Sequence, residues 1–230
     1  MNVERVFLKR IDKANLVCQQ HQICNHDHKH HKRVLENALV INSILPKPFN
    51  ERDIHTLVLG HDIGYSCQGI VWVGKNAINH AQRGNEVLKR AATIFLRGQE
   101  KIAVVALINT LPTNTKEAIA RLEATDPLPA AIKLADCLDY FHTDRVKHVP
   151  QPYPDEHNYY FLAKSVTSYT IHNEAPKTLA WTIDLKPGVD KTLWESTAQA
   201  NFQQIFTLAE LFAQRLHFTF RLALTLNGEA

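Results

Sequence analysis

The stretch Leu57-Val-Leu-Gly-His-Asp-Ile-Gly64 places an imidazole and a carboxylate side by side at the end of an apolar segment. We expect a helix here that is capped by Asp53 and terminated by Gly64. Side chains at a helix end can both reach one cation, because the last turn no longer separates their faces. Alone, the His61-Asp62 pair is weak evidence, since such a pair also occurs by chance at solvated helix ends.

Other potential ligands occur in order along the chain, in His30-His-Lys-Arg-Val34, in His80-Ala-Gln-Arg-Gly84 and in Leu134-Ala-Asp136. Each lies on or beside an apolar helical stripe, where unpaired polar groups are costly to bury. Two imidazoles and two carboxylates suit a divalent manganese, iron, cobalt, nickel or zinc ion, with magnesium as an alternative. We therefore predict a metal site formed by four residues: His30, His61, Asp62 and Asp136.

The first ligand comes from a histidine-rich tract, which could instead be a surface chelator. His30 continues the apolar stripe of the helix expected over residues 30–45, so we favour it as the ligand. His26 lies one turn earlier and is the main alternative. We expect His28 and His31 to point away from that face.

This ordered set resembles the HD superfamily of metal-dependent phosphohydrolases, in particular its HDIG-type members. The family signature matches the four predicted ligands, and the next two residues complete the HDIG form: His30, His61, Asp62 and Asp136, then Ile63-Gly64. His80 also looks like the histidine that precedes the next helix in the family. The resemblance spans about residues 25–144, and it implies a bundle of helices that hydrolyses phosphate esters with a bound divalent metal.

The sequence departs from the family pattern at Asn109, where members with two metals carry a further histidine. Asparagine is a poor ligand for transition metals. We therefore expect one divalent metal and regard a second site as doubtful. The same departure argues against an HD-fold di-iron oxygenase, which stays an alternative, as does a regulatory HD module without catalysis.

The resemblance suggests a role for each site residue. A bound metal would activate a water molecule and neutralise charge at phosphorus. We expect Asp62 to orient that water as well as to bind the metal, and His80 to donate a proton. The alternative for His80 is a solvated residue at a helix start. Candidates for contact with the substrate are Arg33, Lys75, Arg83 and Asn109, and each charged one could equally be a solvated surface group.

Composition limits the classes of binding partner and the cellular compartment that we expect for this protein. The 230 residues are 45% hydrophobic and 21% charged, as in ordinary globular proteins, and the net charge of +3 is too small to predict nucleic-acid binding. The longest apolar run, near residues 102–108, is too short to span a membrane. Residues 1–17 lack a secretory apolar core, and the four cysteines form no close pairs. We expect a cytoplasmic enzyme acting on a small phosphorylated molecule, such as a nucleotide, and a homodimer is an option.

Three prolines at positions 150, 152 and 154 mark an expected boundary between an HD domain over 1–149 and a small α+β subdomain over 150–230. Alternating apolar residues predict three strands, over 164–172, 178–183 and 218–226. A long helix capped by Asp190 separates the last two strands. The predicted fold is mainly α, with a short antiparallel sheet packed on that helix. Residues 66–76 lack periodicity and are expected to be a loop, either a lid over the substrate or a segment packed on the sheet.

Overall fold

The computed structural model describes residues 3–21, 23–68, 70–73, 76–77, 79–109, 111–112, 114–123, 127–149, 157–175 and 177–226. The first part of the chain is helical: α1 (Val3–Gln20), α2 (His28–Ser43), α3 (Glu51–Gly60), the 3-10 turn η1 (Ile63–Ser66), α4 (His80–Phe95), α5 (Gly98–Ile108), α6 (Thr115–Glu123), α7 (Pro127–Leu138) and the 3-10 turn η2 (Thr143–Arg145). A short hairpin, β1 (Trp72–Val73) and β2 (Asn76–Ala77), interrupts this series within the predicted loop over 66–76.

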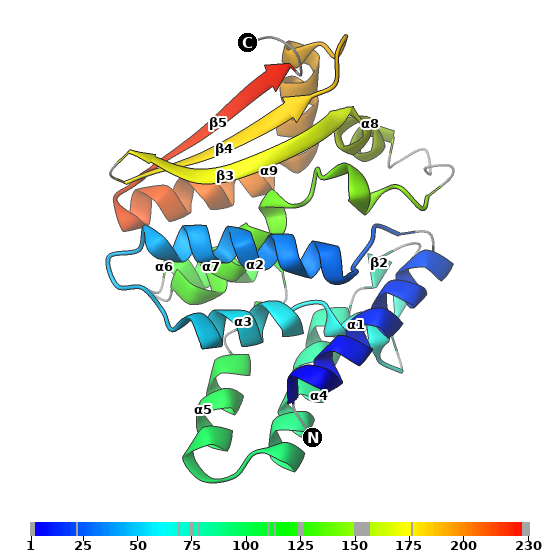
Figure 1. Cartoon of the computed structure of the whole chain (residues 1–230), viewed down its shortest axis with the longest axis vertical. Coiled ribbons are helices and arrows are strands. Elements are labelled where there is room, and N and C mark those ends of the chain that lie inside the picture. The colour runs from blue at the N-terminus through cyan, green and yellow to red at the C-terminus, as the bar shows by residue number, and fades with distance from the viewer. Residues whose placement is uncertain are drawn as a thin grey trace.

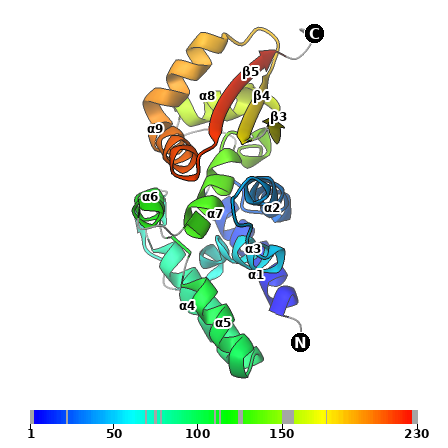
Figure 2. The ribbon, with the colours of Figure 1, turned by 90° about the vertical axis from the view of Figure 1, so that its left-hand side faces the viewer.

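The last part of the chain contains α8 (His157–Ser165), β3 (Val166–Ala175), β4 (Thr178–Leu185), the long helix α9 (Lys191–Leu216) and β5 (Thr219–Leu226). The sheet covers α9 at one end of the molecule, and the α4–α5 pair projects from the other end (Figure 1). Helix α7 lies in the interior, where it contacts α2 on one side and α9 on another (Figure 2). The mainly helical fold with a small sheet on a long helix is therefore as predicted.

The sheet is mixed, so the prediction of an antiparallel sheet is wrong for one of its two strand pairs. The strand order is β3-β4-β5. Strands β3 and β4 form an antiparallel hairpin, whereas β5 runs parallel to β4, with Thr178 opposite Thr219. Helix α9 is the reason, because it carries the chain back along the sheet before β5 begins. Alternation of apolar residues predicts a strand but not its direction.

Helix α3 begins and ends earlier than predicted. Asn50 is the cap in place of Asp53, and its side chain accepts a hydrogen bond from the backbone N–H of Arg52 at 2.9 Å. The helix ends at Gly60, one residue before His61, to which we expected it to run ahead of Gly64. His61 and Asp62 therefore follow the helix directly, where the backbone is free to turn.

Helix α1 was not predicted from the mixed charged and apolar residues at the start of the chain. Its buried residues Ile11, Ala14 and Cys18 are fully covered, and their spacing is that of one helical face. The cap of α9 was predicted correctly, since the Asp190 side chain accepts a hydrogen bond from the backbone N–H of Leu193 at 3.0 Å.

One hydrophobic core joins the helices to the sheet. Phe141, just after α7, stacks on Trp181 of β4 at 5.9 Å between ring centroids and meets Trp194 of α9 at 5.3 Å. All three rings are at most 1% exposed. The boundary predicted at 150–156 lies outside the described residues, but the parts on either side share this core.

No helix among the described residues has both the length and the apolar character needed to cross a bilayer. All four cysteines are free.

Candidate metal site

His30 lies in the first turn of α2 and is fully buried. The side chain of Asp27 caps the helix by accepting from the His30 backbone N–H at 2.9 Å, which fixes where the helix begins. The two ring nitrogens of His30 have different partners. Nδ1 lies 2.6 Å from Asp139, whereas Nε2 lies 3.2 Å from both His61 Nε2 and an Asp62 oxygen.

His61 and Asp62 reach the same point from the end of α3. His61 Nδ1 lies 2.6 Å from the carbonyl oxygen of Val58, one turn back, so this nitrogen is the donor. Nε2 then faces Asp62 and Asp136, at 3.1 Å and 3.7 Å. Asp62 is 6% exposed.

Asp136 enters from α7, and its two oxygens have separate roles. Oδ1 faces the two histidines, at 3.6 Å from His30 Nε2 and 3.7 Å from His61 Nε2. Oδ2 accepts from Lys133 Nζ at 2.8 Å. Lys133 lies one turn earlier on the same helix, so it can hold the carboxylate without blocking the histidines.

The four predicted ligands therefore meet at one point, and among the residues described no other group of histidine, cysteine and acidic side chains does so. One ligand atom from each of His30, His61, Asp62 and Asp136 lies within 4.8 Å of the other three. Ligands bound to one metal at about 2.0–2.2 Å are about 3.0–3.5 Å apart in tetrahedral or octahedral geometry. The separations of 3.1 Å and 3.2 Å lie inside this range, and those of 3.6 Å and 3.7 Å lie slightly beyond it, so the cluster could hold a metal ion.

Burial and charge determine the protonation of these groups. Burial raises the pKa of Asp62, but His61 and His26 outweigh it and hold that pKa well below the usual range. Burial likewise raises the pKa of Asp136, and Lys133 and His61 outweigh it. Burial lowers the pKa of His61, whereas Asp62 and Asp136 raise it to about 10. Both carboxylates are therefore ionised at neutral pH, and without a metal they are balanced by protons on nearby groups.

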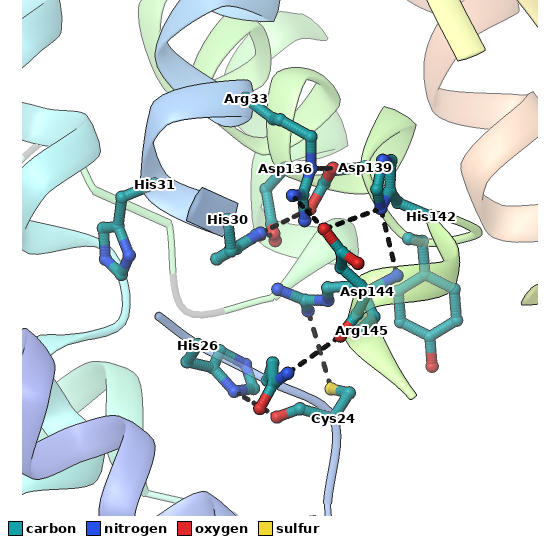
Figure 3. Close-up of polar contacts among 12 residues, drawn as sticks. Cys24, His26, His30, His31, Arg33, Asp136, Asp139, His142, Asp144 and Arg145 are labelled. Atoms are coloured by element: carbon teal, nitrogen blue, oxygen red, sulfur yellow. Dashed lines mark hydrogen bonds and ion pairs between the residues drawn. The ribbon is translucent and has the colours of Figure 1, made fainter. Parts of the chain in front are cut away.

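Asp139, a fully buried carboxylate just after α7, contacts Nδ1 of His30, the ring nitrogen that faces away from the cluster (Figure 3). Arg33 donates to both oxygens of Asp139, at 2.5 Å and 3.1 Å. Burial raises the pKa of Asp139, but His30 and Arg33 together bring it below the usual range. Carboxylates in this position fix the tautomer of a metal-binding histidine, so that Nε2 faces the ligand cluster.

A small pocket opens on the cluster from the side of α4. His61, Asp62 and Asp136 are part of its lining. The rest of the lining consists of polar and apolar side chains from α4, α7 and the segment after α5: His80, Ala81, Asn85, Lys133, Leu111, Pro112 and Ile132. His80 stacks on Tyr65 at 4.4 Å between ring centroids, which holds the imidazole at the rim. His80 thus lines the same pocket as His61, Asp62 and Asp136.

Of the other predicted substrate contacts, the three that the structure describes do not line this pocket. Arg33 lies behind His30 on Asp139, with a further contact to Asp144 at 3.5 Å. Arg83 pairs with Glu86 at 2.9 Å on the exposed side of α4. Asn109 is exposed at the end of α5. Lys75 lies outside the described residues.

The histidine-rich tract divides differently from the prediction. His28 is half exposed and pairs with Asp12. His31, which was expected to point away, is buried at 4% exposure, with its ring 5.0 Å from that of His61. The reason is that α1 and α3 cover this side of α2 as well. His26 approaches Asp62 at 3.4 Å but lies outside the four-residue cluster.

Apolar residues 70–73 were expected to form a lid or to pack on the sheet. Trp72 instead stacks on His21, just after α1, at 3.8 Å between ring centroids. It also lies 6.4 Å from the ring of Tyr65. The aromatic rings therefore run from the surface near α1 to His80 at the pocket rim.

Sequence reasoning missed Lys133 and Asp139, although a signal was present. Both lie three residues from Asp136, Lys133 one turn before it on α7 and Asp139 in the turn that follows the helix. Comparisons with protein-family models, with curated proteins and with solved structures find no match, so the case for a function depends on the residues of this site.

Proposed function

We propose that this protein is a metal-dependent phosphohydrolase of the HD type, which cleaves a phosphate ester of a small molecule such as a nucleotide. The observation that supports it most is the convergence of His30, His61, Asp62 and Asp136 beside an accessible pocket. These four residues are selected from the sequence by their order and spacing, and they come from α2, from α7 and from the turn that follows α3. Residues chosen from the sequence in this way would not be expected to meet in space by chance.

A divalent ion held there would supply positive charge at the phosphoryl group and lower the pKa of a water molecule. The protein contributes the rest. Asp62 is ionised and turned toward the pocket, so one of its oxygens can accept a proton from the attacking water. Lys133 and His80 lie on the pocket wall, where they can donate to phosphate oxygens or to the leaving group.

The pocket lining favours a small, partly apolar phosphate ester. Lys133, His80 and Asn85 supply polar groups near the cluster. Leu111 and Pro112, with Ile132, form an apolar wall beside them. A phosphate would contact the polar side, and the organic part of the substrate would contact the apolar side.

The test is a phosphate-release screen on protein purified without a histidine tag. The protein is stripped with a chelator and reloaded separately with manganese, iron, cobalt, nickel, zinc or magnesium. Nucleoside mono-, di- and triphosphates, cyclic nucleotides and simple phosphomonoesters are then tested. We expect hydrolysis that requires the metal and that Asp62→Asn abolishes.

Two results would contradict the proposal. Oxygen consumption by the iron-loaded protein without phosphate release would favour the oxygenase. Stoichiometric metal without turnover of any substrate would favour a regulatory module.

Lys133→Met is expected to lower kcat/KM by roughly 10–100-fold, because the variant loses a charged donor beside the reacting phosphate. Methionine keeps the length of the side chain. Metal content should stay stoichiometric, since all four predicted ligands are present. Lys116→Met on α6, where the lysine is exposed, is the matched control and should leave kcat/KM unchanged. Equal rates for the two variants would exclude Lys133 from the site.

A further inference from the structure

Asp139 is bound from three directions, although it is completely buried. One oxygen lies 2.6 Å from His30 Nδ1 and accepts from Arg33 at 3.1 Å. The other oxygen accepts from Arg33 at 2.5 Å and from the Tyr169 hydroxyl at 2.9 Å. Three side chains therefore determine how this carboxylate is turned.

Tyr169 differs from the other two because it comes from the sheet. It lies on β3, which packs against α2. Its hydroxyl accepts a hydrogen bond from the Asn37 side chain at 3.0 Å, and the same amide donates to the carbonyl oxygen of Ala135 at 3.0 Å. The phenolic proton goes to Asp139, at 2.9 Å, because the side-chain oxygen of Asn37 is farther away, at 3.5 Å. Burial, followed by the charge of Asp139, raises the pKa of Tyr169, so the phenol stays protonated and donates.

We propose that Tyr169 is a positioning residue, through which the sheet holds Asp139 and so orients His30 toward the metal. The inference rests on the metal site of the proposed function. It gives the last third of the chain a defined role, because β3 supplies the outermost member of a chain of contacts that runs from Tyr169 through Asp139 to His30.

Arg33 alone would hold Asp139 less well. Its guanidinium also contacts Asp144, at 3.5 Å, so it is shared between two carboxylates. Tyr169 donates to the oxygen of Asp139 that is not turned to His30, and it leaves the other oxygen free for Nδ1. Without that bond, the carboxylate can rotate toward Arg33 and away from the imidazole.

The test compares Tyr169→Phe with Ser168→Ala in the metal-free full chain. Each variant removes one hydroxyl of β3 that donates to a carboxylate. The Ser168 hydroxyl donates to Asp184 at 2.5 Å. Cobalt(II) is titrated while its visible absorption is recorded. We expect Tyr169→Phe to weaken cobalt binding roughly fivefold to tenfold and to change the absorption bands. Ser168→Ala should match the wild type in both.

A double-mutant cycle with Asp139→Asn separates positioning from general stability. If Tyr169 acts through Asp139, Tyr169→Phe has no further effect on cobalt affinity once Asp139 is replaced. Additive effects, or equal affinities for Tyr169→Phe and the wild type, would overturn the inference while leaving the metal site intact. Absence of cobalt binding by the wild type would instead overturn the proposed function and this inference together.

Thermal unfolding of each variant shows whether the fold is retained. Should Tyr169→Phe not fold, Asn37→Ser offers a second route, because it leaves Tyr169 in place and removes the amide that donates to its hydroxyl, together with the bond from that amide to the carbonyl oxygen of Ala135. It is expected to weaken cobalt binding about twofold to threefold. Unchanged affinity and unchanged absorption bands in Asn37→Ser would then count against the inference.

Discussion

Alanine in place of His61 is expected to lower the affinity for a divalent metal by more than about 100-fold, since loss of a ligand exceeds the 10–100-fold cost of losing an outer partner. His61 is central to the cluster, with its Nε2 within 3.7 Å of His30, Asp62 and Asp136. The variant removes one of the two imidazoles that face the carboxylates of Asp62 and Asp136. Metal analysis after dialysis, and competition with a chromogenic chelator, measure the loss.

His55→Ala is the matched control for that experiment. His55 lies on α3, the helix that His61 directly follows, and it is also partly buried, but it is not part of the cluster. We expect its metal content to equal that of the wild type. If His61→Ala keeps a stoichiometric metal after dialysis, the metal is bound elsewhere and the site is wrong.

Gly64→Ala is expected to destabilise the protein by more than about 3 kcal/mol, at the upper end of the cost of overpacking. A Cβ at this position would overlap the backbone carbonyl of His80, and it would come within 3.0 Å of the backbone nitrogen of Gly84. Backbone atoms cannot move aside as a side chain can. The start of α4 would have to shift and would carry His80 away from the pocket.

Gly60→Ala provides the contrast, four residues earlier. Its Cβ would meet only the end of the Leu88 side chain, at 2.7 Å, and that side chain can change its rotamer. We expect a loss within about 1 kcal/mol. For a chain of this size, thermal unfolding should differ between the two variants by roughly 4–8 °C or more. Similar unfolding temperatures for the two variants would show that Gly64 of η1 does not pack this closely against the backbone of α4.

Much of the candidate site follows from the sequence. The ligand set is predicted because polar residues interrupt apolar helical stripes, which is a local property that the order of residues records. His30, His61, Asp62 and Asp136 do meet in space, and His80 lines the pocket beside them. Whether they bind a metal and hydrolyse phosphate stays a prediction for the experiments above.

Other features could not be predicted from local patterns, because they depend on contacts between distant residues. Tyr169 follows Asp139 by thirty positions and belongs to the sheet, yet its hydroxyl contacts that carboxylate. Arg33 has the sequence context of a phosphate-binding residue beside a motif, but its guanidinium donates to both oxygens of Asp139. When a charged side chain lies near a site in the sequence, only the fold shows which group it contacts.

The order of residues was sufficient to predict the helical class, the final strands and the four residues that converge, because periodic burial and ligand chemistry are visible residue by residue. The packed fold was needed to establish that β5 runs parallel to β4, that Asn50 begins α3 and that Asp139 and Lys133 support the cluster. These features arise from packing between segments far apart in the chain. The Leu57–Gly64 stretch predicts a His-Asp pair, and the packing of α2, α7 and β3 around it makes that pair part of a site.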